Sequence, residues 1–136
     1  MIGLDTNVLI RYLTQDDEQQ SEIATRVIEN ELNNENKGFV SLIVLVEIVW
    51  VLMRCYGQTK SDLQPIINQI LTTKQFQIEQ VDNAFKALRK WQQAKGDFSD
   101  ALIAVLAQDN DCTYTLTFDK KAVSLGMRLA TTSTHY

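Results

Sequence analysis

Four carboxylates in this 136-residue sequence stand at positions that suggest a reactive centre. Asp5 and Asp119 directly follow short apolar stretches, Asp100 opens an apolar helix, and Glu47 interrupts a long apolar run. Because a buried, unpaired carboxylate costs several kcal/mol, we expect these acids to be compensated. The sequence has few basic residues near them, so the compensating group is a proton or a divalent cation.

The chemistry of oxygen ligands favours magnesium. Carboxylates without imidazole or thiolate partners suit Mg²⁺ or Mn²⁺ rather than Zn²⁺. The single histidine, His135, is the next-to-last residue, which argues against Ser-His-Asp, Cys-His and His-rich zinc sites. A bound ion lowers the pKa of a water ligand, and a second ion stabilises the departing oxygen of an in-line displacement. The reaction that follows from this logic is phosphodiester hydrolysis.

Alternating strands and helices are predicted to position these acids. The predicted strands cover residues 1–5, 39–41, 76–80, 113–117 and 127–130. The helices between them are predicted at 6–13, 16–34, 42–56, 59–73, 82–95, 98–108 and 119–126. This alternation implies parallel pairing with right-handed crossovers. We therefore predict an α/β fold, a three-layer α/β/α sandwich with a mainly parallel central sheet, formed as a single domain over residues 1–136.

The predicted topology groups the acids. In open parallel sheets ligands bind beyond the carboxyl ends of the strands, so Asp5 and Asp119 are expected on the same edge. Asp97 lies one helical turn before Asp100, on the same side. A structural alternative exists for each aspartate, because Asp5, Asp97 and Asp119 all precede helices and could cap them. Glu47 has no capping role, since it lies in the middle of its helix.

Charge, cysteines and hydropathy further restrict the partners and the cellular location that we expect for the protein. Seventeen acids against 13 bases give a net charge of −4, which argues against a polyanionic partner unless the four acids bind metal. The other 13 acids would then balance the bases. Cys55 and Cys112 lack the paired spacing of zinc or redox motifs, so we expect two buried, reduced thiols. With no signal-type segment and no apolar run long enough for a membrane span, we expect a cytoplasmic protein without membrane association.

Four separated motifs together resemble the PIN domain. They are the opening Ile2–Arg11, the helix that carries Glu47, the stretch Gly96–Ile103, and Thr115–Asp119. The resemblance covers essentially the whole chain in order, and it is greatest to the VapC-type toxins of bacterial toxin–antitoxin pairs. Each motif alone would be weak, but their agreement is specific.

The resemblance implies a Mg²⁺-dependent endoribonuclease, with Mn²⁺ as a possible substitute. It implies that Asp5, Glu47, Asp100 and Asp119 form the acidic set, with Asp97 as an auxiliary acid. It also implies an RNA substrate, homodimerisation, and neutralisation by a cognate VapB-type antitoxin. Beside the acids, hydroxyl and amide groups are candidates for orienting the carboxylates or bound waters. These groups belong to Thr6, Asn7, Ser41 and Thr117.

Basic and apolar residues suggest partner surfaces. Arg11, Lys120 and Lys121 are candidates for contacting the RNA backbone. A basic group at 86–95 could do the same or could form an ordinary solvated helix face. Trp50 could face a partner, but we favour a position in the core because an apolar stripe is more often buried.

Two other functions are compatible with parts of the sequence. A phosphatase with Asp5 as its nucleophile would need a second aspartate two residues later, where this chain has Asn7. A non-catalytic binding module would have no need for a complete acid set. Both are therefore weaker interpretations than the nuclease.

Overall fold

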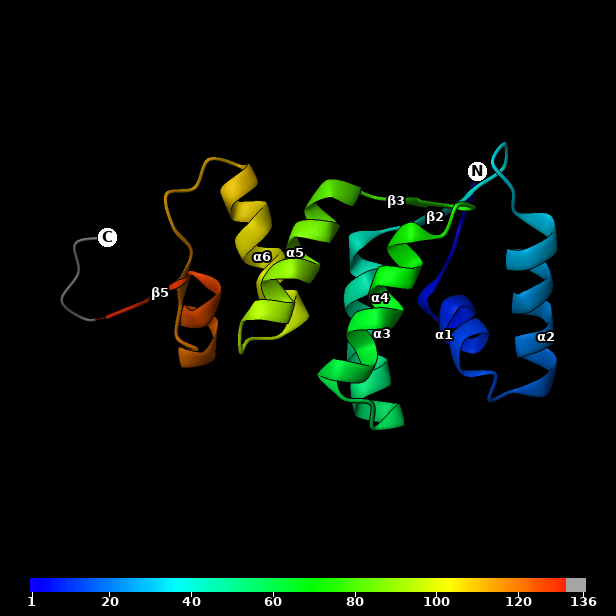
Figure 1. The fold of residues 1–136 in the computed structure, drawn as a ribbon, viewed down its shortest axis with the longest axis horizontal. Coiled ribbons are helices and arrows are strands. Elements are labelled where there is room, and N and C mark those ends of the chain that lie inside the picture. Colours follow the sequence, from blue (N-terminus) through cyan, green and yellow to red (C-terminus); the bar gives the residue numbers. More distant parts are fainter. Residues whose placement is uncertain (132–136) are drawn as a thin grey trace. The chain divides into compact units, whose positions relative to one another are not determined.

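The computed structural model describes residues 1–131, and His135 lies outside them. The chain forms two compact units, Met1–Val81 and Asp82–Tyr136. The single domain expected over residues 1–136 stays a prediction. Figure 1 shows both units and labels their helices and strands where there is room.

The first unit contains a parallel sheet and most of the helices. Its elements are β1 (Ile2–Gly3), α1 (Thr6–Thr14), α2 (Glu18–Arg26), η1 (Val27–Glu31), β2 (Gly38–Val40), α3 (Leu42–Tyr56), α4 (Lys60–Thr72) and β3 (Phe76–Ile78). β2 is the central strand and pairs in parallel with both β1 and β3. The predicted α/β class is confirmed, because helices flank this parallel central sheet.

Gly38 permits a close approach of side chains to the central strand. A Cβ atom at this position would lie 2.6 Å from Cδ1 of Leu4 and 2.8 Å from Cδ1 of Leu32. Both leucine side chains are buried. Leu4 thus packs directly on β2, and its backbone N–H donates to the carbonyl of Phe39 at 3.0 Å. These contacts fix the chain where it leaves β1 and turns into α1.

Helix α1 lies between α2 and α3 (Figure 1), and it packs on both. Its buried side chains, Thr6, Leu9 and Ile10, share one face, as expected for an amphipathic helix. The predicted helix over 16–34 is shorter and less regular than expected. It is α-helical only in α2 and continues as the π-helical η1, because the N–H of Leu32 bonds to the carbonyl of Val27 at 2.9 Å.

Helix α3 has the predicted limits. Ser41 caps its start by accepting a hydrogen bond from the N–H of Val44, and Gly57 ends it with φ +64°. Its buried face packs into the first unit, whereas Ile43 and Trp50 point to solvent with exposed fractions of 72% and 54%. The prediction that Trp50 is a core residue is therefore wrong.

The second unit contains α5 (Val81–Gln93), α6 (Phe98–Asp109), β4 (Leu116–Thr117), η2 (Lys120–Leu125) and β5 (Arg128–Leu129). Trp91 and Phe98 pack edge to face with 5.3 Å between ring centroids, and both are fully buried. β4 and β5 form a short parallel pair. The strand predicted over 113–117 is thus limited to its last two residues.

Other predictions concern thiols and membranes. Cys55 and Cys112 are free but exposed, so the expectation of buried thiols is wrong. Across the described part of the chain, no helix has the length and hydropathy needed to cross a membrane.

Candidate active site

Asp5 begins α1 without capping it. The residue occupies the N-cap position with extended backbone angles, φ −79° and ψ 156°, but its side chain makes no capping hydrogen bond. An aspartate at this position ordinarily accepts a hydrogen bond from the first turn. The exposed Asp5 carboxylate is therefore free for another interaction.

Thr6 and Glu47 connect the start of α1 to the middle of α3. Thr6 is buried, and its Oγ1 donates a hydrogen bond to Oε1 of Glu47 at 3.0 Å. Glu47 itself is exposed, on the side of α3 away from the buried face. A hydroxyl donor of this kind restricts the orientation of the carboxylate.

The other polar residues predicted beside these acids differ in their roles. The Ser41 hydroxyl is used to cap α3, with 3.2 Å between its Oγ and the Val44 nitrogen. Asn7 is exposed in the first turn of α1. Ser41 therefore stabilises the helix that carries Glu47 instead of presenting a free hydroxyl.

Arg11 is held by contacts within the first unit. Its Nη1 lies 3.3 Å from Oδ1 of Asp16 and 3.2 Å from the hydroxyl of Tyr56, and its Nε donates to Gln20 at 2.8 Å. The Tyr56 hydroxyl also donates to Asp16. Hydrogen bonds from Tyr56 and Thr14, together with the charge of Arg11, hold the pKa of Asp16 below its usual value. This network favours a structural role for Arg11 over the predicted contact with RNA.

Sequence reasoning missed this network. The Asp16–Tyr56 pair joins residues 40 positions apart, so no local spacing could indicate it. Asp17, the next residue, caps α2 by accepting a hydrogen bond from the N–H of Gln20 at 2.8 Å.

In the second unit, three aspartates influence one another. Asp97 is the N-cap residue of α6 but makes no side-chain capping bond, and Asp100 lies in the first turn. Burial raises the pKa of Asp100, and the negative charges of Asp97 and Asp119 raise it further, against a hydrogen bond from the Asp97 backbone. Repulsion between these carboxylates is the electrostatic signature of a site that a cation would stabilise.

Asp119 does have a capping role. Its Oδ1 accepts a hydrogen bond from the N–H of Lys121 at 2.9 Å, at the start of η2. The Thr117 hydroxyl accepts one from the N–H of Asp119 at 3.0 Å, which fixes the backbone between β4 and η2. The predicted capping alternative is thus correct for Asp119, although one of its carboxylate oxygens remains available.

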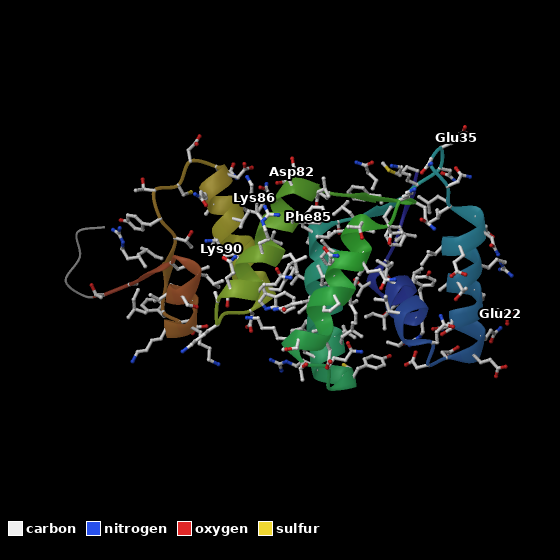
Figure 2. All side chains as sticks on the ribbon, viewed as in Figure 1. Glu22, Glu35, Asp82, Phe85, Lys86 and Lys90 are labelled. Carbon is white, nitrogen blue, oxygen red and sulfur yellow. The ribbon has the colours of Figure 1, made fainter. Side chains whose placement is uncertain are left out.

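Basic side chains of the second unit lie on α5 and η2. Lys120 and Lys121 are exposed directly after Asp119. Lys86 and Lys90 lie on α5 (Figure 2). Nζ of Lys90 donates to the carbonyl of Leu125 at 2.9 Å, so this lysine has a structural partner.

The acids are more accessible than the sequence suggested. Asp5, Glu47 and Asp119 are exposed, and Asp100 is half-buried. Of these four acids only Asp100 is partly buried, so only Asp100 incurs part of the expected free-energy cost of burying a carboxylate. The acids at the element ends are accessible because helix N-termini face solvent, and Glu47 is accessible because α3 buries only its opposite face.

The chemistry of these residues fits a hard divalent cation. All of the candidate ligands are carboxylates, which suit Mg²⁺ or Mn²⁺. Asp5 and Asp97 lack capping bonds, and the raised pKa of Asp100 reports uncompensated negative charge nearby. Taken by itself, neither unit holds three or more His, Cys, Asp or Glu side chains arranged as a metal site within residues 1–131.

A comparison with protein families agrees with these motifs. The family model of the PIN domain matches residues 2–126 of the chain. The matched segment includes all five acids considered above. This chain belongs to the PIN domain family.

A curated relative makes the likeness more specific. Over 125 residues the chain is 26% identical to a VapC ribonuclease of Aquifex aeolicus (strain VF5). The alignment covers 92% of this chain and 92% of the relative. The similarity therefore spans both proteins almost completely.

Proposed function

We propose that this protein is a Mg²⁺-dependent endoribonuclease that acts as the toxin of a type II toxin–antitoxin pair. The observation that carries the proposal is the PIN family match over residues 2–126, in a chain that retains the acidic residue of every motif. The full-length similarity to a VapC ribonuclease supports RNA as the substrate.

Asp5, Glu47, Asp100 and Asp119 are the proposed catalytic metal ligands, with Asp97 as an auxiliary ligand. Two local features support these assignments: Asp5 and Asp97 occupy cap positions without capping, and Glu47 is oriented by Thr6. When bound, Mg²⁺ or Mn²⁺ supplies a Lewis acid and lowers the pKa of a coordinated water.

The remaining polar residues have supporting roles in this proposal. Thr6 orients Glu47, and Thr117 fixes the backbone of Asp119. Lys120 and Lys121 are exposed beside Asp119 and bind phosphates of the RNA backbone. Such phosphate contacts position the substrate but carry no sequence preference of their own.

The proposed partners are a VapB-type antitoxin and a second copy of the chain. The homodimer is proposed from the family resemblance alone, because the exposed Ile43 and Trp50 share a face of α3 with the proposed metal ligand Glu47. Light scattering of the purified, antitoxin-free chain tests this assignment, and a monomer at micromolar concentration contradicts it.

RNA cleavage by the antitoxin-free protein tests the function. The chain is incubated with total RNA in Mg²⁺ or in EDTA, beside Asp5→Asn and the matched control Asp111→Asn. Asp111 is exposed and has φ +64°, a conformation that asparagine tolerates, so the control should fold normally. We expect cleavage by the wild type and the control in Mg²⁺ only.

Two results would contradict the proposal. Cleavage that persists in EDTA and in Asp5→Asn would exclude the carboxylate mechanism. Absence of both RNA cleavage and Mg²⁺ or Mn²⁺ binding would instead favour the non-catalytic binding module.

A further inference from the structure

The exposed face of α3 brings an aromatic ring next to a proposed metal ligand. Four exposed side chains recur at helical spacing on this face, opposite the buried one: Ile43, Glu47, Trp50 and Arg54. Residues three apart on a helix have their Cβ atoms about 5–6 Å apart. Trp50 therefore neighbours Glu47 along the helix surface.

Arg54 completes this group. Its guanidinium carbon lies over the Trp50 ring, 5.4 Å from the ring centroid. A guanidinium in this position is attracted by the π system and restricts the orientation of the indole. Within residues 1–131 no carboxylate forms an ion pair with Arg54, so its charge is available to an anionic ligand.

Thr6 joins this face of α3 to the start of α1. Its hydroxyl donates to Glu47 at 3.0 Å, and it directly follows Asp5, the other proposed metal ligand of the first unit. An elongated ligand that lies along residues 47–54 would thus have a proposed metal ligand at one end and a guanidinium at the other.

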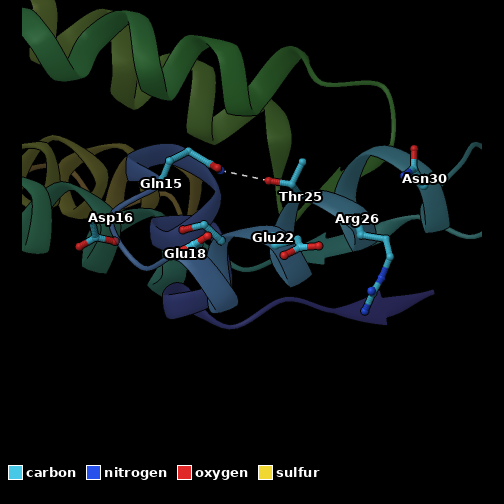
Figure 3. A pocket seen from close by; sticks show the side chains of 8 residues that line it. Gln15, Asp16, Glu18, Glu22, Thr25, Arg26 and Asn30 are labelled. Carbon is cyan, nitrogen blue, oxygen red and sulfur yellow. Dashed lines mark hydrogen bonds between the residues drawn. The ribbon is translucent and has the colours of Figure 1, made fainter.

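The charge of the first unit favours this face over α2 for a polyanion. Acidic side chains line the pocket along α2, namely Asp16, Glu18 and Glu22 (Figure 3). Arg26 lines it too, but it lies 3.7 Å from Glu31, so its charge is partly offset. Phosphates are repelled there, whereas the α3 face offers the charge of Arg54.

We propose that Trp50 stacks on an unpaired base of the RNA substrate and that Arg54 contacts the adjoining phosphate. Aromatic side chains bind single-stranded nucleic acids by stacking, and every base offers a surface for it. In a duplex the bases stack on one another and are closed to Trp50. This role rests on the proposed ribonuclease function and deepens it, because it restricts the substrate to single strands and loops. A second copy of the chain on this face would instead cover Glu47, which the proposed function needs open.

Binding of short oligonucleotides to the full-length chain in EDTA tests this role, because the proposed nuclease is inactive without metal. The probes are fluorescein-labelled octauridylate and an octamer of abasic ribose phosphates, which has the same phosphates but no bases. Affinity is measured by anisotropy. We expect Trp50→Leu to weaken octauridylate binding by about tenfold, through loss of one stacked base, and binding of the abasic octamer by less than about twofold. Trp50→Phe keeps a ring and should stay within about threefold of the wild type.

Tryptophan fluorescence gives a signature that a purely structural role for Trp50 would not. The chain has two tryptophans, and the other one, Trp91, is fully buried. Stacking on a base quenches indole emission, so unlabelled octauridylate should quench the exposed tryptophan and the abasic octamer should not. In Trp50→Phe octauridylate should still bind, as followed by anisotropy, but without quenching.

The salt dependence of binding tests Arg54. Each phosphate contact to a single strand contributes about −0.7 to the slope of log K against log salt concentration. Arg54→Ala should therefore make the slope shallower by about 0.7 for both octamers. Arg26→Ala, on α2, removes the same charge and should leave the slope unchanged. Arg54→Lys keeps the charge and should keep the slope.

Other outcomes overturn the proposal. Failure of the wild type to bind octauridylate, or equal loss of both octamers in Trp50→Leu, would exclude a contact between the ring and a base. Conversion of a dimer to a monomer by Trp50→Leu, measured by light scattering, would make this face an interface between copies.

Failure of the stacking role and failure of the ribonuclease function give different results. Unaltered octauridylate binding by Trp50→Leu, together with RNA cleavage by the wild type in Mg²⁺, would remove the stacking role and leave the function standing. Absence of RNA cleavage by the wild type would contradict the function itself, whatever the octamers show.

Discussion

Replacing Thr6 by valine should weaken divalent-metal binding without unfolding the protein. Valine keeps the size and branching of threonine but cannot donate the 3.0 Å hydrogen bond to Glu47. Thr6 is 6% exposed, so the substitution also removes a polar group from a buried position. The variant therefore tests the hydroxyl alone.

The expected magnitudes follow from the surroundings of the bond. Hydrogen bonds to charged groups contribute about 1.5–3 kcal/mol, but water can replace the donor because Glu47 is exposed, so we expect a loss of about 1 kcal/mol in unfolding free energy. Loss of a group that orients a metal ligand typically costs about 10–100-fold in metal affinity. We expect the lower end, about tenfold, because Glu47 is one ligand of several.

Two assays separate these effects. Urea unfolding in EDTA measures stability, and calorimetric titration with Mn²⁺ or Mg²⁺ measures affinity. Thr6→Ser is the matched control, since it keeps the hydroxyl and should retain the affinity within about twofold. Glu47→Gln sets the scale for loss of the carboxylate itself.

Two outcomes would refute the reasoning directly. If Thr6→Val binds the metal as tightly as the wild type while Glu47→Gln does not, the hydroxyl does not position the carboxylate. If Thr6→Ser loses as much affinity as Thr6→Val, the methyl group and not the hydroxyl is responsible.

Two further predictions concern packing and titration. Gly38→Ala should destabilise the protein by about 1–3 kcal/mol, because the added Cβ would press on buried leucine side chains. Gly3→Ala, where no atom lies within 4 Å of the added Cβ, should melt within a few degrees of the wild type. Equal melting temperatures for the two variants would contradict this account. Asp97→Asn should lower the pKa of Asp100 in metal-free protein, as followed by carboxyl ¹³C shifts, but leave it above the usual value of an aspartate because burial is the larger cause. A carboxyl group whose pKa is raised on folding stabilises the folded state. This contribution is complete at pH values below the pKa in the unfolded state, and it is lost as the pH rises through the pKa in the folded state. Asp97→Asn should therefore make the free energy of unfolding less sensitive to pH in that window. An unchanged Asp100 pKa would show that Asp97 exerts no electrostatic effect on it.

Helix limits were predictable where local signals agreed. The apolar run from Leu42, the capping Ser41 and the terminal Gly57 defined α3 correctly. The end of α2 was not predictable, because the helix continues as a π-helix, in which the N–H of Leu32 bonds to the carbonyl of Val27, five residues earlier. Periodicity cannot distinguish a π turn from an α turn over so few residues.

Side-chain burial was less predictable than secondary structure. Helix α3 is apolar on nearly every side, so its sequence gave no indication that Trp50 would face solvent. The packing of α1 and α4 on α3 decides which of its sides is buried, and the contact with α1 is not local. Cys55 lies on the same side of α3 as the buried Ile48 and Leu52 but in the last turn of the helix, and it is exposed there.

The local roles of the acids were also only partly predictable from the sequence. Helix N-cap positions for Asp5, Asp97 and Asp119 could be predicted from sequence, but only Asp119 uses its carboxylate as a cap. The hydrogen bond between Thr6 and Glu47 joins residues 41 positions apart, and only the folded chain reveals it.

The two accessible thiols allow an intramolecular distance to be measured in the native chain. Cys55 belongs to the first unit and Cys112 to the second, and the sequence contains no other cysteine. Paired spin labels can therefore be attached to the native protein without engineering, and dipolar spectroscopy then reports a single intramolecular distance. The same thiols make a reducing buffer necessary during purification, because air oxidation would cross-link neighbouring molecules.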